Sequence, residues 1–537
     1  MKIANLMANR RRKPAQDRRR ETIPAPLGVP SVTSLAKRPK VAIVGGGIAG
    51  LTAATALAER GVAVEVFESQ TYLGGRVGGW TQRCGNTDLA MNRGFHAFFR
   101  QYYNLRELLS RIDPDLSMLT PLSDYPLIDN LGHRDTFRGL PRTPPWNAVM
   151  FALRSPTFRL SDFTHLDARA AAPMAAVSVP RIYEELDDTD AESFLNAIRF
   201  PEAAKHLAFE VFSRSFFAHP TELSAAELVT MFHIYFLGSN EGLIFDVPNA
   251  NYNTALWDPL RRYLEQRGVR FRMGTGITRI DPADGDTLQL ETDSGDTVTA
   301  DGVVLATHIP GLRAIAEASP DLGNQSWRDQ IARLRNAPPY GVHRMWLDRP
   351  VAAERAAFLG TAGYEPLDNI SVLNRYEREA ADWSLANRGS VLEMHCYAMD
   401  TASPQYPPIP GAVHKLNELY PETASATTVF EQTLIHEDCP LFEPGSRARR
   451  PGVRTPHPGL FMAGDGIRID LPVALMERAA TTGWTAANHL LSRWGIAGFP
   501  LCTVPNRSRL ALLGQIATRY GKDVDDDVRS DTAKVVQ

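Results

Sequence analysis

The sequence predicts an α/β fold built on a Rossmann-type parallel sheet, for three reasons. A short apolar strand at residues 40–44 runs into a glycine-rich turn and a helix-period segment at 48–60, and a second strand follows at 62–68. A buried strand ending in small residues lies at 301–307, and another at 459–466 ends in Gly-Asp. Strands that alternate with helices are typical of parallel sheets with crossover helices.

The turn has the spacing G-x-G-x-x-G, formed by Gly45, Gly47 and Gly50. Gly45 is expected to allow the tight turn, Gly47 to let a pyrophosphate approach the backbone, and Gly50 to let helix and strand pack closely. The N-terminus of the following helix favours an anion through its N–H groups and dipole. Glu68 ends the second strand, where it would meet a ribose. This unit predicts a dinucleotide site; a glycine-rich turn without a ligand is the alternative.

Composition excludes several classes of function. With 537 residues the chain has room for two or more domains, and its net charge of −3 gives no reason to expect a nucleic-acid partner. The four cysteines include no C-x-x-C pair and the thirteen histidines no H-x-x-x-H pair, so no disulfide or metal site is expected. The uncharged run 228–240 is too short to span a bilayer. These features favour a cytoplasmic protein.

Residues 1–38 are predicted to be a disordered basic tail, because Arg, Lys and Pro dominate and large apolar residues are few. Two basic clusters, at 10–13 and 18–20, could attract anionic lipid. A solvated tail and an organellar transit peptide are the alternatives. Residues 513–537 are polar, with an acidic run, and predict a second tail.

The residues after the second strand favour a flavin. Ser69 and the run Gly74-Gly75-Arg76 follow Glu68. Glycine backbone and a guanidinium can together meet phosphate oxygens or a ribityl chain, which suits a flavin dinucleotide better than a nicotinamide one.

The aromatic segment 94–105 has the sequence Gly-Phe-His-Ala-Phe-Phe-Arg-Gln-Tyr-Tyr-Asn-Leu. It closely resembles the plant-type phytoene and ζ-carotene desaturases, flavoenzymes of the amine-oxidase-like superfamily. The resemblance implies a Rossmann-type FAD-binding domain (amine-oxidase-like, glutathione-reductase-like) with an α+β substrate domain inserted in two blocks. The predicted FAD-binding domain comprises 39–115, 245–310 and 455–512, and the substrate domain 116–244 and 311–454.

Residues 116–244 lose the α/β rhythm. Prolines punctuate the first part, and aromatic residues recur at helical spacing over 209–237. Such a stripe indicates a protein core; the alternative is the lining of a long apolar tunnel, or a face that rests on lipid. Phe232 and Tyr235 are the candidates for such a lining.

The α/β pattern resumes at residue 254. A helix containing Leu256, Leu260 and Leu264 is followed by strands at 269–272 and 276–280 and by the buried strand 301–307. The resemblance implies that the Ile277 region meets the adenine through its backbone, and that the last strand returns to the Rossmann sheet. Further strands are predicted at 342–347 and 390–396.

The last diagnostic stretch contains Gly464-Asp465 and the start of a helix near Met476. Asp465 is expected to hold ribityl or phosphate oxygens. The helix N-terminus would aim N–H groups and its dipole at the flavin N1–C2=O edge and so stabilise the reduced, anionic flavin. Glu477 and Arg478 have an alternative reading as a solvated helix pair.

The predicted cofactor-binding residues come from all of these motifs. They are Gly45, Gly47, Ile48, Ala49, Gly50, Glu68, Ser69, Gly74, Gly75, Arg76, Phe95, Ile277, Ala306, Thr307, Gly464, Asp465, Val473 and Met476. Non-covalent FAD is expected, because no Cys or His lies beside the Gly464-Asp465 motif.

The sequence of the C-terminal segment narrows the resemblance to one group within this family. Residues 471–483, 494–496 and 503–507 look most like the bacterial isorenieratene synthases, β-carotene desaturase/methyltransferases that make aromatic ring ends. The resemblance spans roughly residues 40–510. It implies that flavin N5 accepts a hydride from an allylic ring carbon, that a methyl group shifts within the ring, and that proton loss completes each step. It also implies a carotenoid substrate, a membrane lipid surface as partner with peripheral attachment, and quinone or oxygen as electron acceptor.

The candidate catalytic residues are His96, as proton acceptor, and Glu477. Phe98 and Phe99, with Phe95, would supply aromatic walls for a cation in a dry pocket. A structural role for His96 is the alternative. An ordinary carotene desaturase, and a non-catalytic flavin-fold protein that binds prenyl chains or lipid, are the alternative functions.

Overall fold

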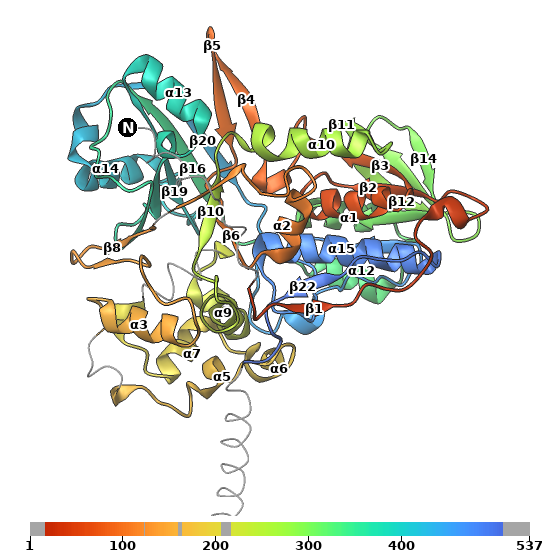
Figure 1. Cartoon of the computed structure of the whole chain (residues 1–537), viewed down its shortest axis with the longest axis horizontal. Helices are drawn as coiled ribbons and strands as arrows, with labels where there is room; N and C mark the ends of the chain where they lie inside the picture. The colour runs from red at the N-terminus through yellow and green to blue at the C-terminus, as the bar shows by residue number, and fades with distance from the viewer. Residues whose placement is uncertain (1–16, 123, 159–163, 206–215, 509–537) are drawn as a thin grey trace, which may run out of the picture.

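The computed structural model describes residues 17–508 except 123, 159–163 and 206–215 (Figure 1). Its centre is a five-stranded, wholly parallel sheet with the order β11-β3-β2-β15-β21. These strands are β2 (Lys40–Val44), β3 (Ala63–Glu68), β11 (Arg270–Met273), β15 (Gly302–Leu305) and β21 (Leu460–Met462). The sheet is therefore assembled from three separate stretches of the chain, and it confirms the predicted α/β fold.

Two helices pack side by side against this sheet, α1 (Ile48–Glu59) and α15 (Leu475–Arg493) (Figure 1). Small residues let them approach closely. A Cβ on Gly483 would lie 2.4 Å from the carbonyl oxygen of Ala49, so only glycine fits at the crossing. Helix α1, the helix of the predicted nucleotide unit, thus packs tightly against α15, which lies more than 400 residues later in the sequence.

A smaller antiparallel sheet follows β11 in the order β12-β13-β14. Its strands are β12 (Ile277–Pro282), β13 (Leu288–Thr292) and β14 (Thr297–Ala300). The helices of this part are α2 (Tyr103–Leu109), α10 (Asp258–Glu265), α11 (Ile309–Ala318) and α12 (Gln325–Ala332). The predicted helix near Leu256 begins as a π-helix over Asn253–Trp257 and continues as α10.

The second large sheet has seven strands in the order β20-β16-β19-β18-β17-β8-β9. They are β8 (Leu127–Asp129), β9 (Arg134–Asp135), β16 (Tyr340–Leu347), β17 (Phe358–Ala362), β18 (Asn369–Val372), β19 (Ser390–Cys396) and β20 (Thr428–His436). The central strands β16 and β19 are buried along their whole length. Helices α13 (Arg378–Asn387) and α14 (Ile409–Leu419) lie beside this sheet (Figure 1).

Short elements join the two large sheets. A three-stranded sheet, β6-β10-β7, combines β6 (Phe98–Phe99), β7 (Leu119–Pro121) and β10 (Phe245–Pro248), and a hairpin pairs β4 (Gly79–Cys84) with β5 (Thr87–Asn92). A helical region contains α3 (Trp146–Arg154), α5 (Ala172–Ala175), α6 (Arg181–Leu186), α7 (Ala191–Ala197) and α9 (Ala225–Phe232), continued by a π-helix at His233–Leu237.

The prediction of a disordered tail over residues 1–38 is wrong from residue 17 onward. Strand β1 (Glu21–Ile23) pairs with β22 (Leu501–Thr503). The carboxylate of Asp17 accepts hydrogen bonds from Tyr103 Oη at 2.8 Å and Ser239 Oγ at 2.6 Å. The basic composition of this segment did not predict these contacts. Strand pairing uses backbone groups, and a single buried acid, Asp17, binds the segment to Tyr103 and Ser239. Residues 1–16 and the predicted tail 513–537 lie outside the described residues.

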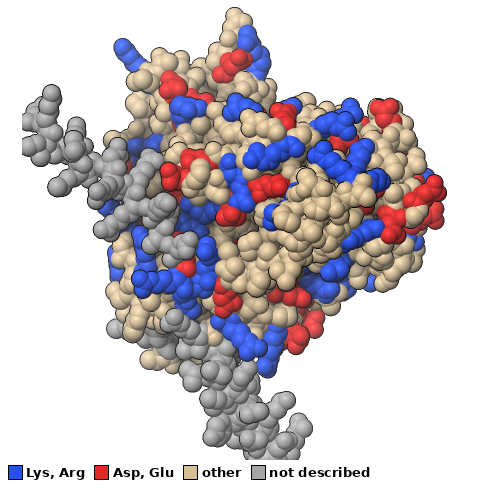
Figure 2. Space-filling model, turned by 45° about the vertical axis from the view of Figure 1, so that its right-hand side comes forward, with Lys and Arg blue, Asp and Glu red and all other residues tan. Residues whose placement is uncertain are grey.

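On the face seen in Figure 2, the described Lys and Arg residues alternate with Asp and Glu. This face therefore has no broad field of one sign of the kind that binds a polyanion.

Candidate active site

A cavity of about 790 Å³ opens at the carboxyl ends of the parallel strands and extends to the second large sheet. Val44, Glu68, Ala306 and Gly464 line it, each at or just after the end of a different strand of the parallel sheet. In open α/β sheets, ligands bind at this edge.

The glycine-rich turn forms one wall of the cavity. Gly45 has φ +108°, and a Cβ there would lie 2.6 Å from Ala306 O, so the turn requires glycine. The nearest atom to a Cβ built on Gly47 is 3.9 Å away, which leaves open space beside the backbone for a phosphate. Gly50 does not line the cavity; its Cβ would lie 1.9 Å from Gly45 O, so it serves the close packing expected of it.

Glu68 lies in the cavity at the end of β3, as predicted. One carboxylate oxygen accepts from Gly46 N at 2.7 Å, and the other from Gln70 N at 2.8 Å. Burial raises the pKa of Glu68 despite these bonds. Ser69 Oγ also donates to Oε1, at 3.4 Å, so the lone pair that remains on Oε2 can accept a hydroxyl of a ribose.

Arg76 and Asp465 bind each other in a two-pronged ion pair, with Nη–Oδ distances of 2.8 and 2.5 Å. Each was expected to bind the cofactor directly. Burial opposes the charge of Arg76, but Asp465 raises its pKa well above the ordinary value. Both residues line the cavity, and each can make hydrogen bonds beyond this ion pair. Ser69, Gly74, Gly75 and Ile277 line it too.

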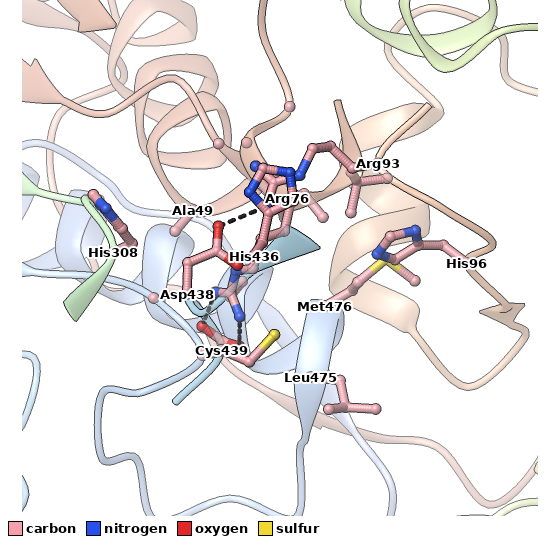
Figure 3. A pocket seen from close by; sticks show the side chains of 18 of the residues that line it. Ala49, Arg76, Arg93, His96, His308, His436, Asp438, Cys439, Leu475 and Met476 are labelled. Atoms are coloured by element: carbon pink, nitrogen blue, oxygen red, sulfur yellow. Dashed lines mark hydrogen bonds and ion pairs between the residues drawn. The ribbon is translucent and has the colours of Figure 1, made fainter. Parts of the chain in front are cut away.

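The N-terminus of α15 opens on the cavity through Leu475, Met476 and Ala479. Leu475 has φ +52°, a left-handed conformation that is rare outside glycine and that concentrates at ligand sites. Figure 3 shows Leu475 and Met476 on this helix, with His96 beyond the sulfur of Met476. Val473, predicted to bind the cofactor, is buried outside the cavity, where its carbonyl accepts from Arg478 Nε at 2.9 Å.

Glu477, a candidate catalytic residue, and Arg478 do not line the cavity, and neither is solvated. Glu477 is buried away from the cavity and accepts from the backbone N–H groups of Asn104 at 2.8 Å and Leu105 at 3.0 Å, which begin helix α2. Arg478 donates to the buried carboxylate of Glu227 at 2.8 Å, and Arg450 donates to the same carboxylate at 2.7 Å. The adjacent cavity residues Leu475 and Met476 turn toward the site because successive residues of a helix face different directions.

His96 lines the cavity. Its Nδ1 lies 2.9 Å from Gly94 O, so Nδ1 has the proton and Nε2 has the lone pair. Burial lowers the pKa of His96 to about 4, which keeps the ring neutral. A neutral imidazole with an available lone pair can accept a proton from a strong carbon acid.

Aromatic rings form the wall beyond His96. Phe95 stacks on Phe358 at 4.3 Å between centroids and packs edge-on against Phe245 at 6.0 Å, and Phe99 meets Phe245 at 5.3 Å. Tyr125 packs on Phe245 at 4.8 Å, and all five rings line the cavity. This arm is apolar, in contrast to the arm beside the glycine turn.

Three residues proposed for this wall lie elsewhere. Phe98 is wholly buried and packs against Tyr252 at 6.5 Å, because it points to the opposite face of its strand from Phe99. Phe232 and Tyr235 belong to a neighbouring core, where Tyr235 Oη lies 3.1 Å from Tyr102 Oη. The interpretation as a core is thus the correct one for Phe232 and Tyr235, whereas Phe217 of the same stripe lines the cavity; Phe209 and Phe212 lie outside the described residues.

Several cavity residues were not found by sequence reasoning. Arg93 donates to Asp438 at 2.7 Å and to Tyr340 Oη at 3.0 Å, close to Arg76 (Figure 3). His308, His436, Cys439, His395 and Tyr397 also line the cavity. Burial raises the pKa of the Cys439 thiol to about 12, so it stays protonated. No local motif marks these residues; strands of the second sheet bring most of them to the site.

The residues present fit FAD. The open backbone at Gly47 suits a pyrophosphate, Glu68 a ribose, and the N-terminus of α15 a group that gains negative charge. Across the described chain, no helix is long and apolar enough to span a membrane, and no cluster of three potential metal ligands occurs.

Comparison with known proteins decides the family. Residues 48–491 match the family described as flavin containing amine oxidoreductase. The chain belongs to this family. It is 54% identical over 503 residues to a carotenoid phi-ring synthase of Streptomyces griseus, covering 94% of this chain and 97% of the relative. It is 26% identical to the carotenoid phi-ring synthase of Chlorobaculum tepidum (87% and 90% covered) and 24% identical to a zeta-carotene desaturase of Zea mays (83% and 82% covered).

Solved structures agree on the fold. Putrescine oxidase bound to putrescine has a TM-score of 0.61 at 16% identity, covering 85% of this chain and all of that one. Cyclohexylamine oxidase from Brevibacterium oxydans has a TM-score of 0.60 at 16% identity with the same coverage. The chain is therefore an FAD-dependent oxidoreductase with the amine-oxidase-like fold, and its sequence is similar to those of a carotenoid phi-ring synthase and a zeta-carotene desaturase.

Proposed function

We propose that the protein desaturates the β-rings of a carotenoid with a methyl shift and so produces aromatic end groups, as in isorenieratene. The observation that supports this most directly is the apolar arm of the cavity, where the rings of Phe95, Phe99, Phe245 and Phe358 line the same cavity as the cofactor arm. The 54% identity to a carotenoid phi-ring synthase supports the same substrate class.

Bound FAD supplies a hydride acceptor. The chain's own contribution is to exclude water and to stabilise positive charge on the ring, since aromatic faces attract cations and a dry site prevents capture by water. Phe95, Phe99 and Phe358 would provide these faces. His96 Nε2 would accept a proton, because a carbon next to a cationic centre is acidic enough to protonate a base whose pKa is about 4.

Hydrogen accounting limits the reaction. Aromatisation with a methyl shift removes four hydrogens from each ring, as two hydrides and two protons, and leaves the carbon count unchanged. The four electrons must pass to an external acceptor, for which quinone or oxygen is proposed. No methyl donor is required.

Expression in cells that accumulate β-carotene, followed by pigment extraction, tests the proposal. Aromatic-ended products whose mass is lower by four hydrogens per ring are the expected result. Changed acyclic desaturation with intact β-rings would instead support an ordinary carotene desaturase, and unchanged pigment with FAD bound would overturn the proposal.

Helix α3 is proposed as the surface that rests on the membrane. Its Trp146, Val149 and Leu153 are 60%, 41% and 54% exposed and lie on one side of the helix at i, i+3 and i+7. The exposed arginines Arg138 and Arg142 precede the helix. An apolar stripe beside cationic side chains fits an anionic bilayer.

A second cavity, of about 330 Å³, supports this location. Arg138, Leu140 and Arg142 line it near α3, and it shares Tyr125 and Phe245 with the large cavity. The two cavities meet at Tyr125 and Phe245, so movement of these side chains would open a path from the bilayer face to the aromatic arm for a C40 hydrocarbon.

Flotation with vesicles that contain anionic lipid tests this surface. Trp146→Glu/Leu153→Glu should reduce vesicle binding, while Leu385→Glu, an 84% exposed leucine on α13, should not. Equal binding of the wild type and the double variant would count against α3, and no binding of the wild type would count against membrane attachment.

A further inference from the structure

Strand β19 and the residue after it have three polar side chains at every second position. They are Glu393, His395 and Tyr397. Alternate residues of a strand point to the same side, so the spacing of two aligns them. Glu393 and His395 are buried, and His395 and Tyr397 line the large cavity. The row therefore leads from the interior of the second sheet to the cavity surface.

Arg344 fixes the charge at the inner end of this row. Its Nη2 and Nε donate to Glu393 Oε2 at 2.7 and 3.0 Å. Although burial favours the neutral acid, Arg344 and His395 lower the pKa of Glu393 to about 2. Glu393 is thus a carboxylate that accepts hydrogen bonds and donates none.

This carboxylate determines the proton positions along the row. His395 Nε2 lies 3.0 Å from Glu393 Oε1. Nε2 must therefore have the proton, because otherwise its lone pair would face a lone pair of the carboxylate oxygen. The N–H of Phe95 also lies 3.2 Å from Nε2, but a neutral amide is the weaker partner. Nδ1 then has the lone pair and accepts from Tyr397 Oη at 2.6 Å. Asn369 Nδ2 donates to the same phenol oxygen at 3.0 Å.

We propose that Tyr397 accepts one of the two ring protons lost during aromatisation and passes its own phenolic proton to His395, whose imidazolium is stabilised by Glu393. This inference rests on the proposed function and deepens it. The ring C–H bond breaks and its electron pair becomes part of a ring double bond. The proton joins the phenol oxygen while the phenolic O–H proton moves to His395 Nδ1. The positive charge thereby leaves the ring and ends in an ion pair with Glu393.

His96 differs from this relay in its surroundings. Its Nδ1 meets a neutral carbonyl, Gly94 O, whereas His395 has a carboxylate behind it. A carboxylate stabilises an imidazolium more than a carbonyl does. Each ring loses two protons, and Tyr397 gives the cavity a second acceptor besides His96.

Tyr397→Phe is the decisive variant, because it removes one oxygen and keeps the ring. We expect production of fully aromatic ends to fall about 10²–10⁴-fold, the usual cost of losing a catalytic acid or base. FAD content should stay at the wild-type level, and anaerobic bleaching of the bound flavin by substrate should keep its rate. Tyr364→Phe, outside the cavity, is the matched control and should retain full production.

Production of aromatic ends by Tyr397→Phe at the wild-type rate would overturn the relay while leaving the proposed function intact. A wild type that makes no aromatic carotenoid would overturn both. A second measurement tests the relay in the wild type, in case the variant fails to fold. The O–H proton of Tyr397 and the N–H protons of His395 exchange with solvent. Wild-type turnover should therefore be slower in D₂O than in H₂O. The ring proton itself does not exchange, so equal rates in H₂O and D₂O would contradict the relay.

Discussion

Glu68 is expected both to hold the backbone of the glycine-rich turn and to bind FAD. Its two oxygens hold the backbone N–H groups of Gly46 and Gln70 and face the cavity. We expect Glu68→Ala to weaken FAD binding by about 1.5–3 kcal/mol, as for a hydrogen bond to a charged group. Glu68→Gln keeps one acceptor oxygen and should lose less. Titration of apo-protein followed by flavin fluorescence measures both; equal affinity for Glu68→Ala and the wild type would exclude the contact.

His96 can be tested separately from fold stability. Gly94 O retains its bond from Tyr252 Oη at 3.0 Å when His96 is removed, so His96→Ala should not leave a buried carbonyl without a partner. We expect FAD to remain bound and the yield of aromatic pigment to fall about 10²–10⁴-fold. Full pigment yield would remove His96 from the mechanism, and parallel loss of flavin and melting temperature would assign it a structural role.

At the scale of elements, Glu227 connects helix α9 to helix α15. Its buried carboxylate binds Arg450 and Arg478 at 2.7 and 2.8 Å. Removing one partner of a buried pair leaves uncompensated charge, so Glu227→Ala should lower the free energy of unfolding by about 3–5 kcal/mol. Glu265→Ala breaks an exposed pair on α10 and should cost about 0–1 kcal/mol. Chemical denaturation that gives similar costs for both would refute the distinction.

Glu477 should make the attachment of α2 to α15 depend on pH. Burial raises the pKa of Glu477 to about 8, from an unfolded value of 4.5, against the lowering by two backbone N–H groups. Between these values the folded protein holds a proton that the unfolded chain releases, so this residue's contribution to stability falls as pH rises from about 4.5 to about 8. The stability difference between the wild type and Glu477→Gln should shrink or reverse over that range. A difference in unfolding free energy that does not change with pH would contradict this.

The elements were largely predictable, whereas their contacts were not. The strand–turn–helix–strand unit at 40–68 and strand β19 have strong periodicity, and the structure has them close to the predicted bounds. Glu477 and Phe98 were assigned to the site by proximity in sequence to true cavity residues. One step along a helix or strand turns a side chain away from its neighbour, and only three-dimensional packing determines which of the two faces the cavity.

At the scale of the whole molecule, the cavity joins three separate stretches of the parallel sheet to the second large sheet. FAD should therefore stabilise the protein as one unit, by about 2.7 kcal/mol when free FAD is 100 times its Kd. Thermal unfolding should show one transition that rises with FAD concentration, and a smaller rise for Glu68→Ala. Two transitions of which only one responds would show that the parts unfold independently.

The site residues that could not be predicted from the sequence lie far from the recognisable motifs. His395, Tyr397, Asp438 and Cys439 come to the cavity from strands and loops without a recognisable motif. Residues such as Gly45, Glu68 and Gly464 could be found because their role depends on local backbone geometry. A side chain that reaches a ligand across a domain leaves no local pattern.

The pairing of β1 with β22 sets an order in time. Residues 21–23 are among the first of the described chain to be synthesised, yet their partners 501–503 come almost last. At about 5–20 residues per second, ribosomes need roughly 25–100 s to make the intervening chain. During that interval β1 lacks its partner strand, Glu227 lacks both arginines, and the parallel sheet lacks β21. The nascent protein therefore lacks a complete flavin site until residues 460–503 have been synthesised.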